Sequence, residues 1–151
     1  MVRIFIETLI KGKFADCRGA YSIVLEAEIN GNIYTRTHFG AWEHATPQRI
    51  QLRAVVDALH YMKEPSLIEI HIKSPYVAAS YQRCDVAKSN RELWLEYWEL
   101  AKEHDIEIIN ESHNEYSPAM ITELKNMKHE YLEDRRNCNG KETGEKREQS
   151  Q

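Results

Sequence analysis

Cysteine, glycine and long apolar runs are scarce in this chain of 151 residues, which has three cysteines and six glycines. The cysteines, at positions 17, 84 and 138, are odd in number and form no C-x-x-C pair, which argues against a disulfide framework and a zinc site. No apolar run approaches the ~20 residues that a membrane span requires. The N-terminal run VRIFIETLI contains Arg3 and Glu7, which favours a strand over a signal peptide. We therefore expect a reduced, cytoplasmic protein that does not associate with membranes.

Excess charge is also small, because 24 acidic and 20 basic residues give a formal net charge of −4. This balance excludes a strongly basic nucleic-acid-binding protein, although a local basic patch remains compatible with it. The segment from Arg135 to Gln151 contains no Val, Ile, Leu, Met, Phe, Trp or Tyr. Because it has almost nothing to bury, we expect one domain over 1–134 and a flexible polar tail over 135–151.

The apolar pattern predicts an alternation of strands and helices. The predicted strands cover 2–9, 19–29, 32–39, 67–73 and 106–109, and the predicted helices cover 47–63, 75–81, 90–104 and 118–132. Asn30-Gly31 is a strong hairpin signal, and Thr46-Pro47 is typical of a helix start. Early hairpins followed by strand–helix units predict a mixed sheet in which strand 2–9 lies between an antiparallel and a parallel neighbour.

Several short segments of the sequence, taken in chain order, resemble motifs of the ribonuclease H family. GAYSIVL from Gly19 is similar to the family's first hairpin, and TPQRIQLRA from Thr46 resembles its T-x-x-R-x-E-L-x-A helix start. KSPYV from Lys73 resembles the D-S-x-Y-V strand end, and a Trp-rich helix and His113 follow in the family's order. The resemblance covers the chain to about residue 130 and implies an α/β fold of the ribonuclease H type. In that fold, helices flank a five-stranded mixed sheet with three antiparallel strands followed by parallel strands.

The resemblance also implies where a catalytic centre lies. In the family, carboxylates from the first strand, the first helical turn and the end of the fourth strand hold two divalent ions for phosphodiester hydrolysis. The matching positions here are Glu7, Gln51 and Lys73, whose summed formal charge is zero against −3 in the family. One unit charge at ~4 Å is worth ~4 kcal/mol at an effective dielectric constant of ~20. We therefore expect no metal or cofactor, and Glu7 as the metal ligand if any is bound.

The family's fourth acid follows a histidine in an H-x-N-E-x-A-D-like segment, where this chain reads ESHNEYSP from Glu111. Either Glu111 or Glu115 is a candidate acid, and the register is open. His113 matches the family's mobile histidine, with a structural histidine at a helix start as the alternative. For the remaining positions, we expect Lys73 to pair with Glu7 and Gln51 to hydrogen-bond one of them; the alternative is that the Lys73 side chain extends into solvent and leaves Glu7 alone.

Three functions are compatible with these residues. The leading hypothesis is a ribonuclease H-like domain that has lost hydrolysis and acts as a nucleic-acid-binding or interaction module. The alternatives are an active nuclease on RNA–DNA hybrids, using Mg²⁺ or Mn²⁺, and a scaffold that binds only protein. Arg49 and Arg53, four residues apart on one helix, form a candidate phosphate clamp. The full set of candidate nucleic-acid-binding residues is Arg36, His38, Arg49, Arg53, Ser74, Lys88 and Arg91.

Overall fold

The computed structural model describes residues 1–83, 89–127 and 149–150, and each predicted strand and helix is present in it. The elements, in chain order, are β1 (Val2–Lys13), β2 (Asp16–Ile29), β3 (Asn32–Ala45), α1 (Pro47–His60), β4 (Leu67–Ile72), α2 (Pro75–Ser80), α3 (Arg91–Ala101), β5 (Asp105–Asn110), α4 (Ser117–Asn126) and β6 (Gln149–Ser150). Three sequence predictions lie wholly or partly outside the described residues: Lys88, the last helix beyond position 127, and most of the tail.

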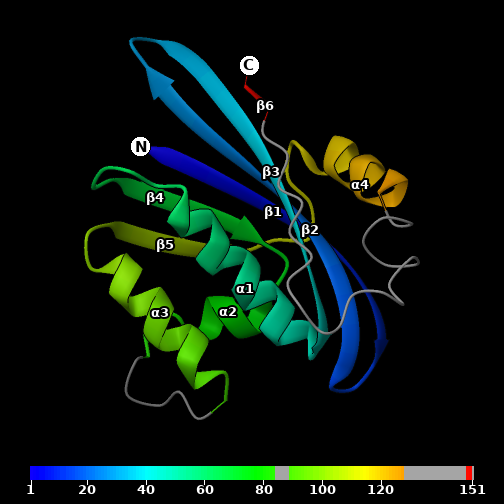
Figure 1. The fold of residues 1–151 in the computed structure, drawn as a ribbon. Helices are drawn as coiled ribbons and strands as arrows, with labels where there is room; N and C mark the ends of the chain where they lie inside the picture. Colours follow the sequence, from blue (N-terminus) through cyan, green and yellow to red (C-terminus); the bar gives the residue numbers. More distant parts are fainter. Residues whose placement is uncertain (84–88, 128–148, 151) are drawn as a thin grey trace.

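The strands form one mixed sheet in the order β5-β4-β1-β2-β3-β6 (Figure 1). The central strand β1 is antiparallel to β2 and parallel to β4, which confirms the predicted topology. Strands β1 to β5 are the five expected from the sequence. The two-residue strand β6 adds to the outer edge of β3, where Gln149 and Ser150 pair with Thr37 and Arg36.

The first three strands are longer than predicted. Strands β1 and β2 remain paired as far as Lys13 and Asp16, and a tight turn joins them at Phe14, whose φ is +54°. Strand β3 likewise continues to Ala45 rather than ending at 39. Most side chains at the β1–β2 tip are exposed, so this end of the hairpin has little need of apolar alternation. The extension of the β1–β2 hairpin therefore left no periodic signal in the sequence.

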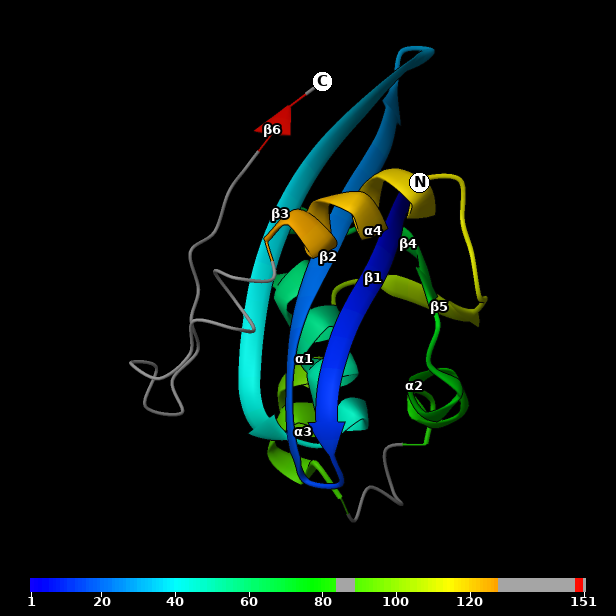
Figure 2. The same cartoon turned by 90° about the vertical axis from the view of Figure 1, so that its right-hand side faces the viewer.

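Helices cover both faces of the sheet (Figures 1 and 2). Because side chains alternate along a strand, Ile4 and Ile6 of β1 pack in the main core with α1 and α3. Phe5, between them, faces the other side and packs against Met120 of α4. Glu7 shares the face of Phe5 and therefore lies on the α4 side. No helix in the described part of the chain is long and apolar enough to cross a membrane.

Two capped helix starts position the residues that follow. The hydroxyl of Thr46 accepts the backbone N–H of Arg49, with Pro47 in the first turn of α1, as the sequence predicts. The hydroxyl of Ser74 in the same way accepts the backbone N–H of Val77 at the start of α2. These caps fix Gln51 in the first turns of α1 and fix Ser74 just beyond the end of β4.

Candidate functional site

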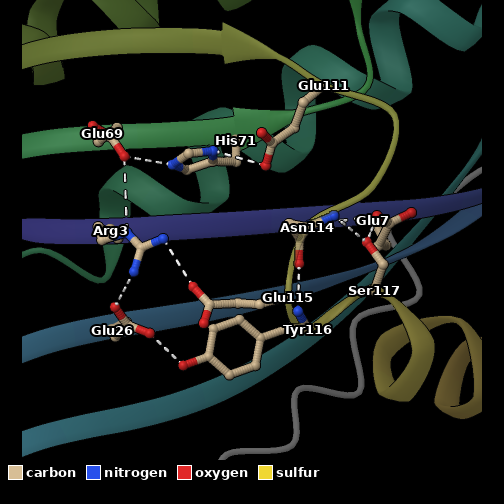
Figure 3. A network of polar contacts seen from close by, with 10 residues as sticks. All are labelled: Arg3, Glu7, Glu26, Glu69, His71, Glu111, Asn114, Glu115, Tyr116 and Ser117. Atoms are coloured by element: carbon tan, nitrogen blue, oxygen red, sulfur yellow. Dashed lines mark hydrogen bonds and ion pairs between the residues drawn. The ribbon is translucent and has the colours of Figure 1, made fainter.

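The candidate site is built around Glu7 on the central strand. Ile6 pairs with Ile72 of the parallel strand β4, so Glu7 and Lys73 come next on neighbouring strands at one edge of the paired region. On its other side, Glu7 lies opposite Ser22 of β2. The Glu7 side chain is half-buried, and it lies beneath the segment that leads into α4 (Figure 3).

Two neutral donors hold the Glu7 carboxylate. The Ser117 hydroxyl donates to Glu7 Oε2 at 2.5 Å, and the Asn114 amide Nδ2 donates to the same oxygen at 3.5 Å (Figure 3). Ser117 Oγ in turn accepts the backbone N–H of Asn114 at 2.9 Å. Because Ser117 is only 2% exposed, this contact is shielded from solvent competition.

The prediction that Lys73 forms an ion pair with Glu7 is wrong. The Lys73 side chain is exposed, and within the described part of the chain it makes no ion pair or hydrogen bond. The reason is that Ser117 and Asn114 already satisfy Glu7, while a lysine at a strand end keeps its charge hydrated at little cost. The two residues are neighbours in the sheet, but their side chains do not pair.

The prediction that Gln51 forms a hydrogen bond with Glu7 or Lys73 is also wrong. Gln51 Oε1 instead accepts the Ser74 hydroxyl at 2.8 Å. Ser74 is fully buried, and its oxygen already caps α2, so one hydroxyl ties α1 to the end of β4. This pairing gives the half-buried Gln51 its polar partner.

Glu111 and Glu115, the candidate acids near His113, form contacts with residues other than Glu7. Glu111 Oε1 lies 2.8 Å from His71 Nδ1, and Glu115 Oε1 lies 2.8 Å from Arg3 Nη2 (Figure 3). Neither carboxylate contacts Glu7 in the described structure. The His113 side chain is exposed.

These contacts hold the segment between β5 and α4 in place. Arg3 bridges Glu115 and Glu26, and Tyr116 donates its hydroxyl to Glu26 (Figure 3). Burial and the hydrogen bond to Glu26 raise the pKa of Tyr116 to about 12, which keeps its hydroxyl a donor. With Glu111 anchored on His71, the segment is fixed on both sides of Asn114. The network therefore positions Ser117 over Glu7.

Ser117 is a site residue that sequence reasoning missed. The only local signal was a polar Asn114, three residues ahead, before Pro118 and a helical pattern, which is typical of a side-chain-stabilised turn at a helix start. Asn114 Oδ1 indeed accepts the backbone N–H of Tyr116 at 2.8 Å. The turn, however, does not show which strand residue the helix start will meet.

The candidate nucleic-acid-binding residues are dispersed, and two of them are engaged by carboxylates. Arg49 forms an ion pair with Glu92 of α3, and Arg53 Nε lies 3.1 Å from Asp57 Oδ1. The Arg53 guanidinium also stacks over Trp42, 4.7 Å from the ring centroid. These pairs reduce the positive charge that the predicted clamp offers to a phosphate.

The other candidates differ in exposure. His38 is 4% exposed and stacks on Tyr61, with ring centroids 3.6 Å apart. Ser74 is buried, as described above, whereas Arg36 and Arg91 are exposed. Contact of any of these residues with a nucleic acid stays a prediction.

The described residues contain no group of three or more His, Cys, Asp and Glu side chains arranged to hold a metal ion. The four positions around the site supply one carboxylate from Glu7, an amide from Gln51, an ammonium from Lys73 and a hydroxyl from Ser117. This donor set is chemically mixed and carries no net charge.

Comparison with known proteins shows similarity to proteins named ribonuclease H. No family model matches it. Ribonuclease H of Clostridium botulinum is 34% identical over 116 residues, which cover 66% of this chain and 75% of that protein. Ribonuclease H of Sulfurovum sp. is 33% identical over 96 residues, 58% of this chain and 63% of that protein. The chain thus spans somewhat less than two thirds of the latter relative.

Solved structures agree on the fold. LC9-RNase H1, described as a type 1 RNase H with the type 2 active-site motif, superposes with a TM-score of 0.65. Its sequence identity is 16%, over 83% of this chain and 72% of that one. LC11-RNase H1, solved in complex with an RNA/DNA hybrid, gives a TM-score of 0.57 at 12% identity, over 82% and 93% of the two chains. With a sequence relative at 34% identity over three quarters of its length, this chain belongs to the ribonuclease H family.

Proposed function

We propose that this chain is a ribonuclease H-like domain that has lost two-metal phosphodiester hydrolysis and acts as a nucleic-acid-binding or interaction module. The observation that carries the proposal is the environment of Glu7. It is the only carboxylate among Glu7, Gln51, Lys73 and Ser117, and a buried serine hydroxyl donates to it.

The residues at this site do not fit a pair of divalent ions. Mg²⁺ and Mn²⁺ are hard cations that take oxygen ligands, and two of them need several carboxylates to offset their charge. Here the ammonium group of Lys73 follows the end of β4, and the amide oxygen of Gln51 already accepts a hydrogen bond from Ser74.

Nucleic acid is the partner that the family relation favours. A structural neighbour was solved with an RNA/DNA hybrid, and this chain shares its fold. With a net charge of −4 and clamp arginines that pair with Glu92 and Asp57, binding by this chain is weak and depends strongly on salt. The compartment we assign is the cytoplasm, where the buried free thiol of Cys17 stays reduced.

A working nuclease is the second candidate, and the relatives named ribonuclease H favour it. It requires Glu7 to act with Glu111 or Glu115 around an ion. In the structure those two carboxylates pair with His71 and Arg3. The segment that carries them would have to release both contacts before either carboxylate reached Glu7.

One assay separates the candidates. Purified protein is incubated with a labelled RNA–DNA hybrid in EDTA, Mg²⁺ or Mn²⁺, and both cleavage and gel retardation are measured. We expect retardation that weakens steeply with salt, and no cleavage under any condition. A Glu7→Gln variant purified in parallel is the matched control. Cleavage that needs Mn²⁺ and disappears in Glu7→Gln would establish a nuclease and refute the proposal, whereas absence of both activities would leave a protein-binding scaffold.

A further inference from the structure

A cavity of about 260 Å³ lies between α4 and the strands β2 and β3, on the face of the sheet that carries Glu7. Its walls are largely apolar, with Val24 and Phe39 from the sheet and Met120 from the helix. The hydroxyl-bearing residues Ser22, Thr35 and Thr37 also line it. Apolar walls with a few polar groups are typical of small-ligand sites, and this volume corresponds to a ring-sized ligand.

Ser22 points to an occupant of this cavity. Its side chain is fully buried, and in the described structure its Oγ has no hydrogen-bond partner. A buried hydroxyl without a partner is costly, and native proteins seldom keep one. Because Ser22 lines the cavity but its hydroxyl is covered, a molecule that enters the cavity and displaces the atoms packed over Oγ can provide the missing hydrogen bond.

The charge of the lining selects the class of ligand. Glu123 of α4 is the only charged residue among the lining residues, and its carboxylate has no partner among the described side chains. The neighbouring Glu26 is already bound by Arg3 and Tyr116. The cavity therefore favours a cation over an anion.

From the cavity, the unpaired Ser22 hydroxyl and Glu123 together, we infer a binding site for a small amphiphilic cation. Such a ligand has a ring-sized apolar body between Phe39 and Met120, a polar atom for Ser22, and an ammonium group near Glu123. Ser22 is directly opposite Glu7 in the strand register, and Tyr116 precedes Ser117. A bound ligand therefore lies beside the Glu7–Ser117 pair. This inference does not depend on the proposed function.

The test uses the full chain, labelled with ¹⁵N, and three probes of equal ring size: benzylamine, benzyl alcohol and benzoate. Saturable amide shifts are expected around Ser22, Thr37 and Met120 for benzylamine, with a dissociation constant on the order of 1 mM for so few atoms. Benzyl alcohol should bind about three- to fivefold more weakly, as one partly exposed charge pair predicts, and benzoate should not bind.

Two variants and one control decide the site. Glu123→Gln should reduce benzylamine to the affinity of benzyl alcohol, and Ala119→Phe should block both probes by filling the cavity. Glu107→Gln removes an exposed carboxylate on β5 and should change nothing. Saturable shifts from none of the probes would mean that water alone fills the cavity, and would overturn the inference. Equal binding of all three probes, or binding unaffected by Glu123→Gln, would overturn it as well, even if Ala119→Phe fails to fold.

Discussion

Ser117 Oγ lies 2.5 Å from Glu7 Oε2 and joins the first residue of α4 to the central strand across 110 residues of sequence. The oxygen donates to the carboxylate and accepts the backbone N–H of Asn114. A neutral hydroxyl thus contacts Glu7 at a place where several acids side by side would require cations.

Ser117→Ala should lower the free energy of unfolding by about 1–2 kcal/mol, because the half-buried Glu7 loses a charge-assisted hydrogen bond. Urea denaturation measures the change. Ser22→Ala is the matched control, since the Ser22 hydroxyl is equally buried but has no partner within the described structure. Ser22→Ala should leave stability unchanged or raise it. Equal losses in both variants would mean that the Ser117 contact contributes little.

Restoring acids should restore metal affinity. The variant Gln51→Glu, Lys73→Asp, Ser117→Asp brings three new carboxylates to Glu7. Without metal it should unfold more easily than the wild type, because like charges repel. Added Mn²⁺ should raise its melting temperature, while the wild type should not respond.

Adding Glu7→Gln to that triple variant provides the control. The quadruple variant should lose most of the Mn²⁺ response if the ion binds at Glu7. A wild-type chain that is itself stabilised by Mn²⁺, with the effect removed by Glu7→Gln, would show that the native donor set holds a metal after all.

Local sequence signals predicted the fold because each of them acts within a few residues. Asn30 and Gly31 have φ values of +53° and +81°, as the hairpin signal requires. Thr46 caps α1 through its own hydroxyl. Apolar residues on both faces of β1, with Ile4 and Ile6 on one face and Phe5 on the other, indicated a central strand between covered faces.

The side-chain contacts of the site could not be predicted in the same way. The charge of Lys73 is satisfied whether the side chain pairs with Glu7 or remains hydrated. Which arrangement forms depends on what other side chains reach Glu7. That residue proved to be Ser117, which the packing of α4 against the sheet brings over the strand. Such a long-range contact leaves no periodicity in the sequence.

Glu92→Gln should strengthen binding to an RNA–DNA hybrid severalfold if Arg49 contacts phosphate. Hydrogen bonds from its own backbone N–H and from Arg49 lower the pKa of Glu92, so the pair is charged at neutral pH. Its contribution to stability is lost only as the pH falls through that lowered pKa. Removing the carboxylate should release Arg49 and steepen the salt dependence by about one phosphate contact. Unchanged affinity in both Glu92→Gln and Arg49→Ala would place Arg49 outside the interface.

Arg53→Met should destabilise the fold by about 3 kcal/mol, because it leaves a buried carboxylate without its cation. The Asp57 side chain is 4% exposed, and besides Arg53 it has the hydroxyl of Tyr21 as a hydrogen-bond donor. Arg18→Met, at an exposed arginine of β2, should cost less than about 0.5 kcal/mol. If the two variants are equally stable to urea, the contact of Arg53 with Asp57 contributes little to the stability of the fold.

Stability should fall above about pH 10 in a way that depends on Tyr116. Its pKa is raised to about 12 in the folded chain, by burial and by the hydrogen bond to Glu26. Between the unfolded and folded pKa values, the unfolded chain loses this proton first, so the free energy of unfolding decreases as pH rises. The stability is fully present below about pH 10 and is lost as the pH approaches 12.

Tyr116→Phe removes this group and should flatten the decline between about pH 10 and pH 12, by an amount on the order of 1 kcal/mol. Urea unfolding at several pH values measures the slope. Tyr34→Phe, at an exposed tyrosine of β3, is the matched control and should keep the wild-type slope. Identical slopes in the wild type and Tyr116→Phe would show that Tyr116 titrates alike in both states. The bond to Glu26 would then not hold the segment that positions Ser117.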